Sequence, residues 1–135
     1  MASILRVNTL TDASSNNSIA TSFVSGGSAK AWALLDLDNS TPANFDSLNL
    51  GSVTDNGTAD MTQNFTSNMG NANYSHAGFP MAQGSGVQGR TVSGHADFPT
   101  TSAVRHQYGY PSSTGGQGTN YEDTQAYLIV HGDLA

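Results

Sequence analysis

Histidine and aspartate are the residue types in this chain best suited to catalysis or metal binding. Besides nine aspartates and one glutamate, the sequence contains four histidines: His76, His95, His106 and His131. His95 and Asp97 are two residues apart, so a strand would place both on one face. Such a pair could begin a metal site, or a base with its orienting carboxylate. No further partner is evident, so we interpret the histidines as half-buried strand residues or interface residues, and we predict no metal site.

Other motifs with catalytic potential are incomplete. The Gly-Ser-Gly of residues 84–86 lacks the spacing of a nucleophile elbow and the helix that must follow it. Asp36-x-Asp38-x-Ser40 resembles the start of a calcium loop without its glycine and terminal glutamate, so we favour an exposed acidic turn. There is no cysteine and no phosphate-binding loop, and no aromatic-rich groove accompanies the aspartates that could cleave a glycoside. We therefore predict a protein that is not an enzyme, with no catalytic residues and no cofactor.

The composition indicates which elements carry these residues. The 135 residues include one lysine (Lys30) and one glutamate (Glu122), while Ser, Thr, Asn and Gly dominate the polar positions. Long straight side chains favour helices, whereas Ser, Asn and Asp favour turns, so we predict an all-β protein. A net charge of -6 with four scattered basic residues disfavours binding to nucleic acid or to an anionic membrane. A hydrophobic fraction of 36% predicts a small core, completed by burial between subunits of a homo-oligomer.

The chain divides at the Ser-Gly-Gly-Ser connector of residues 25–28, which separates an N-terminal arm (1–29) from a domain (30–135). The arm contains two β-prone stretches, Ile4–Val7 and Ile19–Val24, which cannot form a stable unit alone. We expect it to lie against another subunit, another protein or its own domain. Six of its residues are predicted to form an attachment and inter-subunit surface: Ile4, Leu5, Val7, Leu10, Ile19 and Phe23. The arm is too polar for a signal peptide, so we expect synthesis in a cytoplasm without export by that route.

The domain reads as a series of short strands separated by Gly, Asn, Asp and Pro. The turn at Asn56-Gly57 predicts a hairpin, residues 83–94 resist assignment, and Pro111–Asn120 is predicted to be a loop. An antiparallel β-sandwich or jelly-roll-like arrangement follows. The predicted strands are Ala31–Leu35, Phe45–Val53, Ala59–Thr66, Asn73–Phe79, Ser102–Tyr110 and Tyr121–His131. Their aromatic residues predicted to lie in the core are Trp32, Phe45, Phe65 and Tyr74.

The loops around residues 80–95 and 108–121 are expected to face outward. Tyr108 and Tyr110 precede a run of small polar residues, which is typical of an adaptable recognition surface. The alternative is a tyrosine pair that packs at the end of a strand. The residues predicted to face a receptor are Arg90, His95, Tyr108, Tyr110 and Tyr121.

Several segments resemble a known family. The chain opens with MASILRVNTLTDASSNNSI, continues with KAW and FDSLNLGSVTDNGTADMTQNFTSNMGNANYS, and ends in VHGDLA. The first segment resembles the N-terminal segment of tail-fibre and related virion proteins of marine tailed phages, and the others resemble a C-terminal module of phage fibres. The similarity covers residues 1–32, 45–75 and 126–135. The chain departs from the pattern at residues 34–38, Met61 and Gln63, and residues 76–125 have no clear counterpart.

The resemblance implies a homotrimeric virion protein on the particle surface, with a loose likeness to trimeric lectin-like β-sandwiches. The expected partners are two further copies of the chain, other tail or capsid proteins, and a host glycan or receptor. The leading expectation is a tail-fibre-like appendage for host attachment. Two alternatives are a capsid decoration (cement) protein or head fibre that stabilises the phage head, and a carbohydrate-binding lectin-like module.

Overall fold

The chain folds into short antiparallel strands with a single short helix in the part that is described. The computed structural model describes residues 6–15, 17–37, 43–81, 89–111, 117–120 and 125–135. The all-β prediction is confirmed. The elements are β1 (Thr9–Thr11), β2 (Ser18–Ala20), α1 (Thr21–Gly27), β3 (Ala29–Asp36), β4 (Ala43–Leu48), β5 (Leu50–Gly57), β6 (Asp60–Phe65), β7 (Ser75–Met81), β8 (Thr91–Gly94), β9 (Ala103–Pro111), β10 (Gln117–Asn120) and β11 (Gln125–His131).

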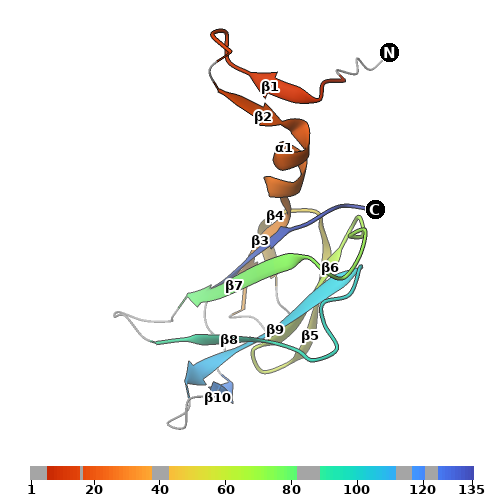
Figure 1. Cartoon of the computed structure of the whole chain (residues 1–135). Helices are drawn as coiled ribbons and strands as arrows, with labels where there is room; N and C mark the ends of the chain where they lie inside the picture. The colour runs from red at the N-terminus through yellow and green to blue at the C-terminus, as the bar shows by residue number, and fades with distance from the viewer. Residues whose placement is uncertain (1–5, 16, 38–42, 82–88, 112–116, 121–124) are drawn as a thin grey trace.

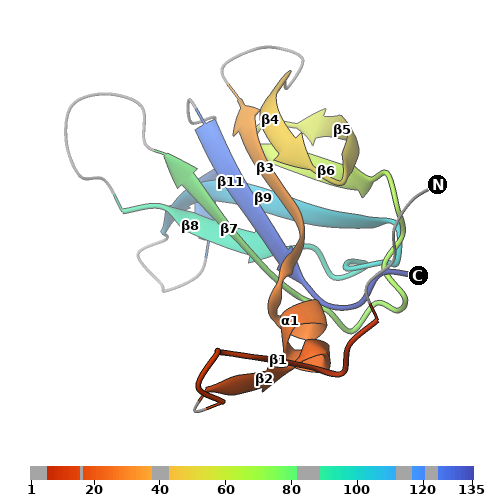
Figure 2. The same ribbon diagram turned by 90° about the horizontal axis from the view of Figure 1, so that it is seen from above.

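The strands form three antiparallel sheets. A five-stranded sheet has the order β10-β9-β6-β5, with β8 paired to β9, and a four-stranded sheet has the order β4-β3-β11-β7. These two sheets lie on either side of one core, while β1 and β2 form a separate hairpin. The hairpin and α1 stand beyond one end of the two larger sheets (Figures 1 and 2).

Alternation along the strands fills the core from both sheets. In β11, Ala126, Leu128 and Val130 are buried while Tyr127 and Ile129 point out, as the sequence predicts. The inward residues of β6 meet them from the five-stranded sheet, including Met61 and Phe65. Because neighbouring side chains of a strand point to opposite faces, one face of each sheet supplies the core.

Tyr74 ties the chain before β7 to the loop before β9. Its buried hydroxyl lies 2.8 Å from the carbonyl oxygen of Thr100 and 2.9 Å from that of Ala103, so its proton is shared between them. Burial raises the pKa of the Tyr74 hydroxyl to about 12, so it remains a donor at neutral pH. The prediction that Tyr74 and Phe65 lie in the core is confirmed, and their rings pack edge to face at 5.9 Å.

The predicted strand Phe45–Val53 is in fact two strands in different sheets. Asn49 separates β4 from β5 with a φ of 58°, a left-handed conformation that asparagine tolerates better than most residues. Its side chain accepts a hydrogen bond from the Ser67 amide at 2.7 Å and donates one to the Ser67 carbonyl at 3.0 Å. The bend at Asn49 passes the chain from the four-stranded sheet to the five-stranded sheet.

Other predicted boundaries also shift. Ile19–Val24 was expected to be a strand, but β2 ends at Ala20 and α1 begins at Thr21, whose hydroxyl bonds the Val7 and Asn8 carbonyls. Pro80 lies inside β7 rather than ending it, because β7 is an edge strand and tolerates a missing amide donor. Two further strands, β8 and β10, occupy parts of the stretches predicted to be unassigned or loop.

Gly132 allows the chain after β11 to pass close to the core. A Cβ at this position would lie 2.7 Å from Tyr74 Cβ and 2.9 Å from Met69 Cε. We expect Gly132→Ala to destabilise the fold by about 1–3 kcal/mol, because Tyr74 Cβ cannot move without the backbone. Urea unfolding at a fixed protein concentration measures the change. Gly26→Ala is the control, since nothing lies within 4 Å of its new methyl group; equal stability of both variants would contradict this prediction.

Candidate functional site

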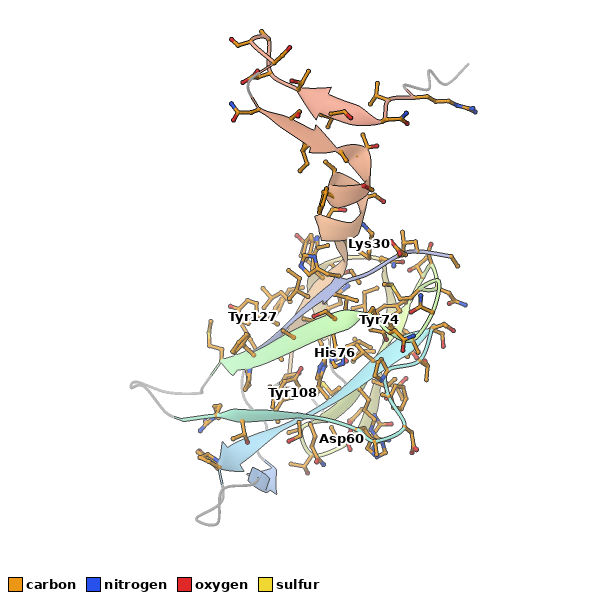
Figure 3. The ribbon with its side chains drawn as sticks, in the orientation of Figure 1. Lys30, Asp60, Tyr74, His76, Tyr108 and Tyr127 are labelled. Atoms are coloured by element: carbon orange, nitrogen blue, oxygen red, sulfur yellow. The ribbon has the colours of Figure 1, made fainter. Side chains whose placement is uncertain are left out.

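Two histidines, predicted only as separate candidates, meet between the two larger sheets. His76 Nδ1 of β7 lies 3.0 Å from His106 Nε2 of β9, so one ring donates a hydrogen bond to the other. His106 is fully enclosed, whereas His76 is partly exposed. The pair therefore links the four-stranded sheet to the five-stranded sheet through their inward faces; His76 is labelled in Figure 3.

The surroundings of this pair keep it uncharged. Burial lowers the pKa of His106 to about 4, and the neighbouring His76 adds to this effect. Burial also lowers the pKa of His76. The enclosed Tyr108 ring lies beside His106, and burial raises the pKa of its hydroxyl, an effect that the nearby Gln63 side chain partly offsets. At neutral pH this is a set of neutral polar groups inside the core, a structural arrangement rather than an accessible base.

The His95–Asp97 pair lies on the surface after β8. His95 Nδ1 is 3.6 Å from Asp97 Oδ2, and the Asp97 side chain is largely exposed. The Asp97 backbone amide also donates a hydrogen bond of 3.4 Å to His95 Nδ1, and the Phe98 ring lies 6.2 Å from the imidazole. Within the described ranges, no group of three His, Cys, Asp or Glu residues is placed to hold a metal ion. Asp38 and Ser40 of the acidic turn and the Gly-Ser-Gly of residues 84–86 lie outside the described residues.

The described residues among those predicted to face a receptor do not form one site. Arg90 and Tyr110 do come together, with the guanidinium carbon 4.2 Å above the ring centroid, which is a cation–π contact. Tyr108 was expected to face outward, and this is wrong, because it is fully buried on the inward face of β9. Tyr121 lies outside the described residues, and His95 lies apart at the other end of β8.

An ion pair that sequence reasoning missed joins β6 to β9. Arg105 Nε and Nη2 each donate a hydrogen bond of 2.7 Å to the Asp60 carboxylate. These bonds raise the pKa of Arg105. The register of the two strands could have predicted the pair. Arg105 lies opposite Thr62, and Asp60 is two residues from Thr62 on the same face of β6. The pair holds neighbouring strands of one sheet together, so we assign it a structural role.

The N-terminal hairpin and helix expose nearly all of their apolar side chains. Helix α1 has no buried residue, and Phe23 is 72% exposed. The segment is joined to the rest through its C-terminal end, where His131 Nδ1 lies 3.1 Å from the Gly27 carbonyl oxygen and Lys30 bonds the Ser25 carbonyl. Ile4 and Leu5 lie outside the described residues. The exposed apolar residues of the segment are Val7, Leu10, Ile19, Phe23 and Val24.

A second exposed apolar surface covers the outward face of the four-stranded sheet. Trp32 and Phe45 were predicted to lie in the core, and this is wrong: Trp32 is 37% exposed and Phe45 55% exposed. Trp32 is on the outward side of β3 because its neighbours Ala31 and Ala33 fill the inward side. A shallow apolar hollow of about 340 Å³ lies on this face, lined by Trp32, Ala33, Leu34, Ala77, Phe79, Tyr127, Leu128 and Ile129.

Comparisons with known proteins give no relative from which a function could be transferred. No protein-family model, curated protein or solved structure matches the chain. In the part of the chain that is described, no helix has the length and hydrophobicity needed to cross a bilayer. The two exposed apolar surfaces are therefore the strongest functional features that the structure provides.

Proposed function

We propose that this chain is a non-enzymatic structural protein of a bacteriophage virion, a surface-exposed, tail-fibre-like appendage involved in host attachment. In this proposal the two larger sheets form a β-sandwich domain that assembles as a homotrimer. Residues 1–29 act as an attachment arm that binds another protein of the particle. The similarity of the N-terminal segment and of residues 45–75 to phage fibre proteins supports the choice of particle.

The observation that carries the proposal is the exposure of the N-terminal hairpin and helix. A two-stranded hairpin is at best marginally stable in water, and a seven-residue helix is too short to persist alone. Such elements gain stability when their apolar side chains are buried, yet Leu10, Ile19 and Phe23 face solvent in the single chain. Burial of these side chains against a neighbouring protein would supply the stabilisation that the single chain lacks. This is the behaviour expected of an attachment arm.

Removal of the arm tests the proposal. We expect a variant that lacks residues 2–24 to fold into the same β structure but to be absent from purified particles, because its docking surface is gone. Incorporation is measured by mass spectrometry of virions grown with the variant, and folding by circular dichroism. Phe23→Asp keeps the whole arm and should reduce incorporation, whereas Thr54→Asp on exposed β5 should not. Normal incorporation of the deletion variant would show that the anchor lies elsewhere.

A further inference from the structure

The outward face of the four-stranded sheet is apolar across its three adjoining strands β3, β11 and β7. Strand register places Trp32, Ile129 and Ala77 side by side in one row. The next row contains Leu34, Tyr127 and Phe79. Tyr127 and Tyr108 lie on opposite sides of this sheet, Tyr108 in the core and Tyr127 on the outward face (Figure 3).

The sequence of these strands is typical of a sheet that is covered on both faces. Strands buried on both faces read as nearly continuous hydrophobic runs, and AKAWALLD of β3 and QAYLIVH of β11 have this form. The five-stranded sheet differs, since β5 carries the polar side chains of Ser52 and Thr54 outward, where both bond Asn64 of β6. Among the described residues, the four-stranded sheet therefore presents a more apolar outer surface than β5 of the five-stranded sheet.

The extent of this face matches one side of a stable protein interface. A large side chain takes about 150–250 Å² out of water when it is fully buried. Multiplied by this area, the exposed fractions of the outward residues give roughly 500 Å² of apolar surface. A standard interface takes about 800 Å² from each partner, of which somewhat more than half is apolar. The side chains that contribute most are Trp32 (37% exposed), Leu48 (47%), Phe79 (70%), Met81 (45%), Tyr127 (40%) and Ile129 (41%).

Charge favours another copy of the chain as the occupant. Copies with a net charge of -6 repel one another, so they associate best through a surface without acidic groups. Within β3, β11 and β7 the two central rows contain no charged side chain. Asp46 of the edge strand β4 pairs with Leu34 and ends the second row, and Asp36 lies in the outer row with Gln125. A basic partner would instead be drawn to the acidic parts of the surface.

We infer that the outward face of β3, β11 and β7 is the interface through which copies of this chain associate. This inference deepens the proposed function, because it rests on the homotrimer and names the surface that holds it together. In the assembled protein Trp32, Tyr127, Ile129 and Phe79 are buried between subunits, and the small core of each chain is completed there.

Thiol labelling of the full chain tests the interface, because the natural sequence has no cysteine. Ile129→Cys places one thiol on the face, and Val92→Cys places one at a similarly exposed position on the five-stranded sheet. We expect a maleimide to label Ile129→Cys at least tenfold more slowly than Val92→Cys. Sedimentation equilibrium should give three times the 14.0 kDa chain mass for the unmodified protein and for Val92→Asp, and a single chain mass for Ile129→Asp.

The outcomes separate this inference from the proposed function. A trimer in which Ile129→Cys reacts as fast as Val92→Cys would overturn the interface and leave the trimer standing. A monomer at all concentrations would overturn both. If Ile129→Asp fails to fold, the conservative Ile129→Cys variant still decides, because its labelling rate is read in the assembled protein. Protection of Ile129→Cys in a trimer supports the inference.

Discussion

The folded chain is expected to lose about 3 kcal/mol of stability through His106 as the pH falls from about 6.5 to 4. Burial lowers the pKa of His106 to about 4 in the folded protein, below its ordinary value of 6.5 in the unfolded chain. Between these values the unfolded chain binds the proton and the folded chain does not. Neutral His106 therefore contributes its full stabilisation above the pKa of the unfolded chain. This stabilisation is lost as the pH falls to the pKa of the folded chain. His76 acts in the same direction, because burial lowers its pKa too.

Urea unfolding at pH 7, 6, 5 and 4 and at one protein concentration measures this loss. His106→Gln removes the titrating group while it keeps a polar side chain beside His76 and Tyr108. We expect its free energy of unfolding to depend much less on pH in this range, whatever its level at pH 7. The same pH dependence in both proteins would show that the histidine pair is not the source.

Leu35→Ala is expected to cost about 2–5 kcal/mol, since truncation of a fully enclosed leucine leaves a cavity. Leu35 is 0% exposed near the C-terminal end of β3, and it packs in the cluster that both larger sheets share. Leu134→Ala is the matched control, because Leu134 is 45% exposed and its truncation should change stability by less than about 0.5 kcal/mol. Thermal unfolding followed by circular dichroism compares them. A loss below about 1 kcal/mol for Leu35→Ala would contradict a core at this position.

Most of the strands could be predicted because they depend on local patterns. Strands were predicted at Ala59–Thr66 and Tyr121–His131, and the structure has β6 and β11 within these ranges. The Asn-Gly signal predicted the β5–β6 hairpin, but its turn lies elsewhere than expected. Asn56 and Gly57 belong to β5, and the turn falls at Thr58 and Ala59, where Ala59 takes a left-handed φ of 54°. Helix α1 was missed because seven residues with two glycines carry no helical periodicity.

The side of a sheet that faces the core could not be predicted from alternation alone. In β3 both faces are apolar, so the sequence pattern does not distinguish the face of Trp32 from the face of Leu35. The choice depends on how the second sheet covers the first. Small Ala31 and Ala33 fill the inward side of β3, and the larger Trp32 is left outside. The prediction for Tyr108 was wrong in the opposite direction. Its polar neighbours in sequence suggested exposure, whereas the opposite sheet encloses its ring.

The side-chain pairs could not be predicted because they join distant parts of the chain. His76 and His106 are 30 residues apart and belong to different sheets, and Asp60 and Arg105 are 45 residues apart. The sequence shows each of these residues, but which residue it contacts depends on strand topology and register. For the N-terminal segment, the sequence did indicate weak burial, because its two apolar stretches are short. Its role in attachment stays a prediction.

The most direct test of the central claim is quantitative mass spectrometry of purified virions from a phage that encodes this chain. We predict that the chain is part of the particle, in a copy number that is a multiple of three. A few copies would fit a tail fibre, and many copies a decoration of the head. If the chain is absent from intact particles while it is abundant in the lysate, the virion role proposed for it is contradicted.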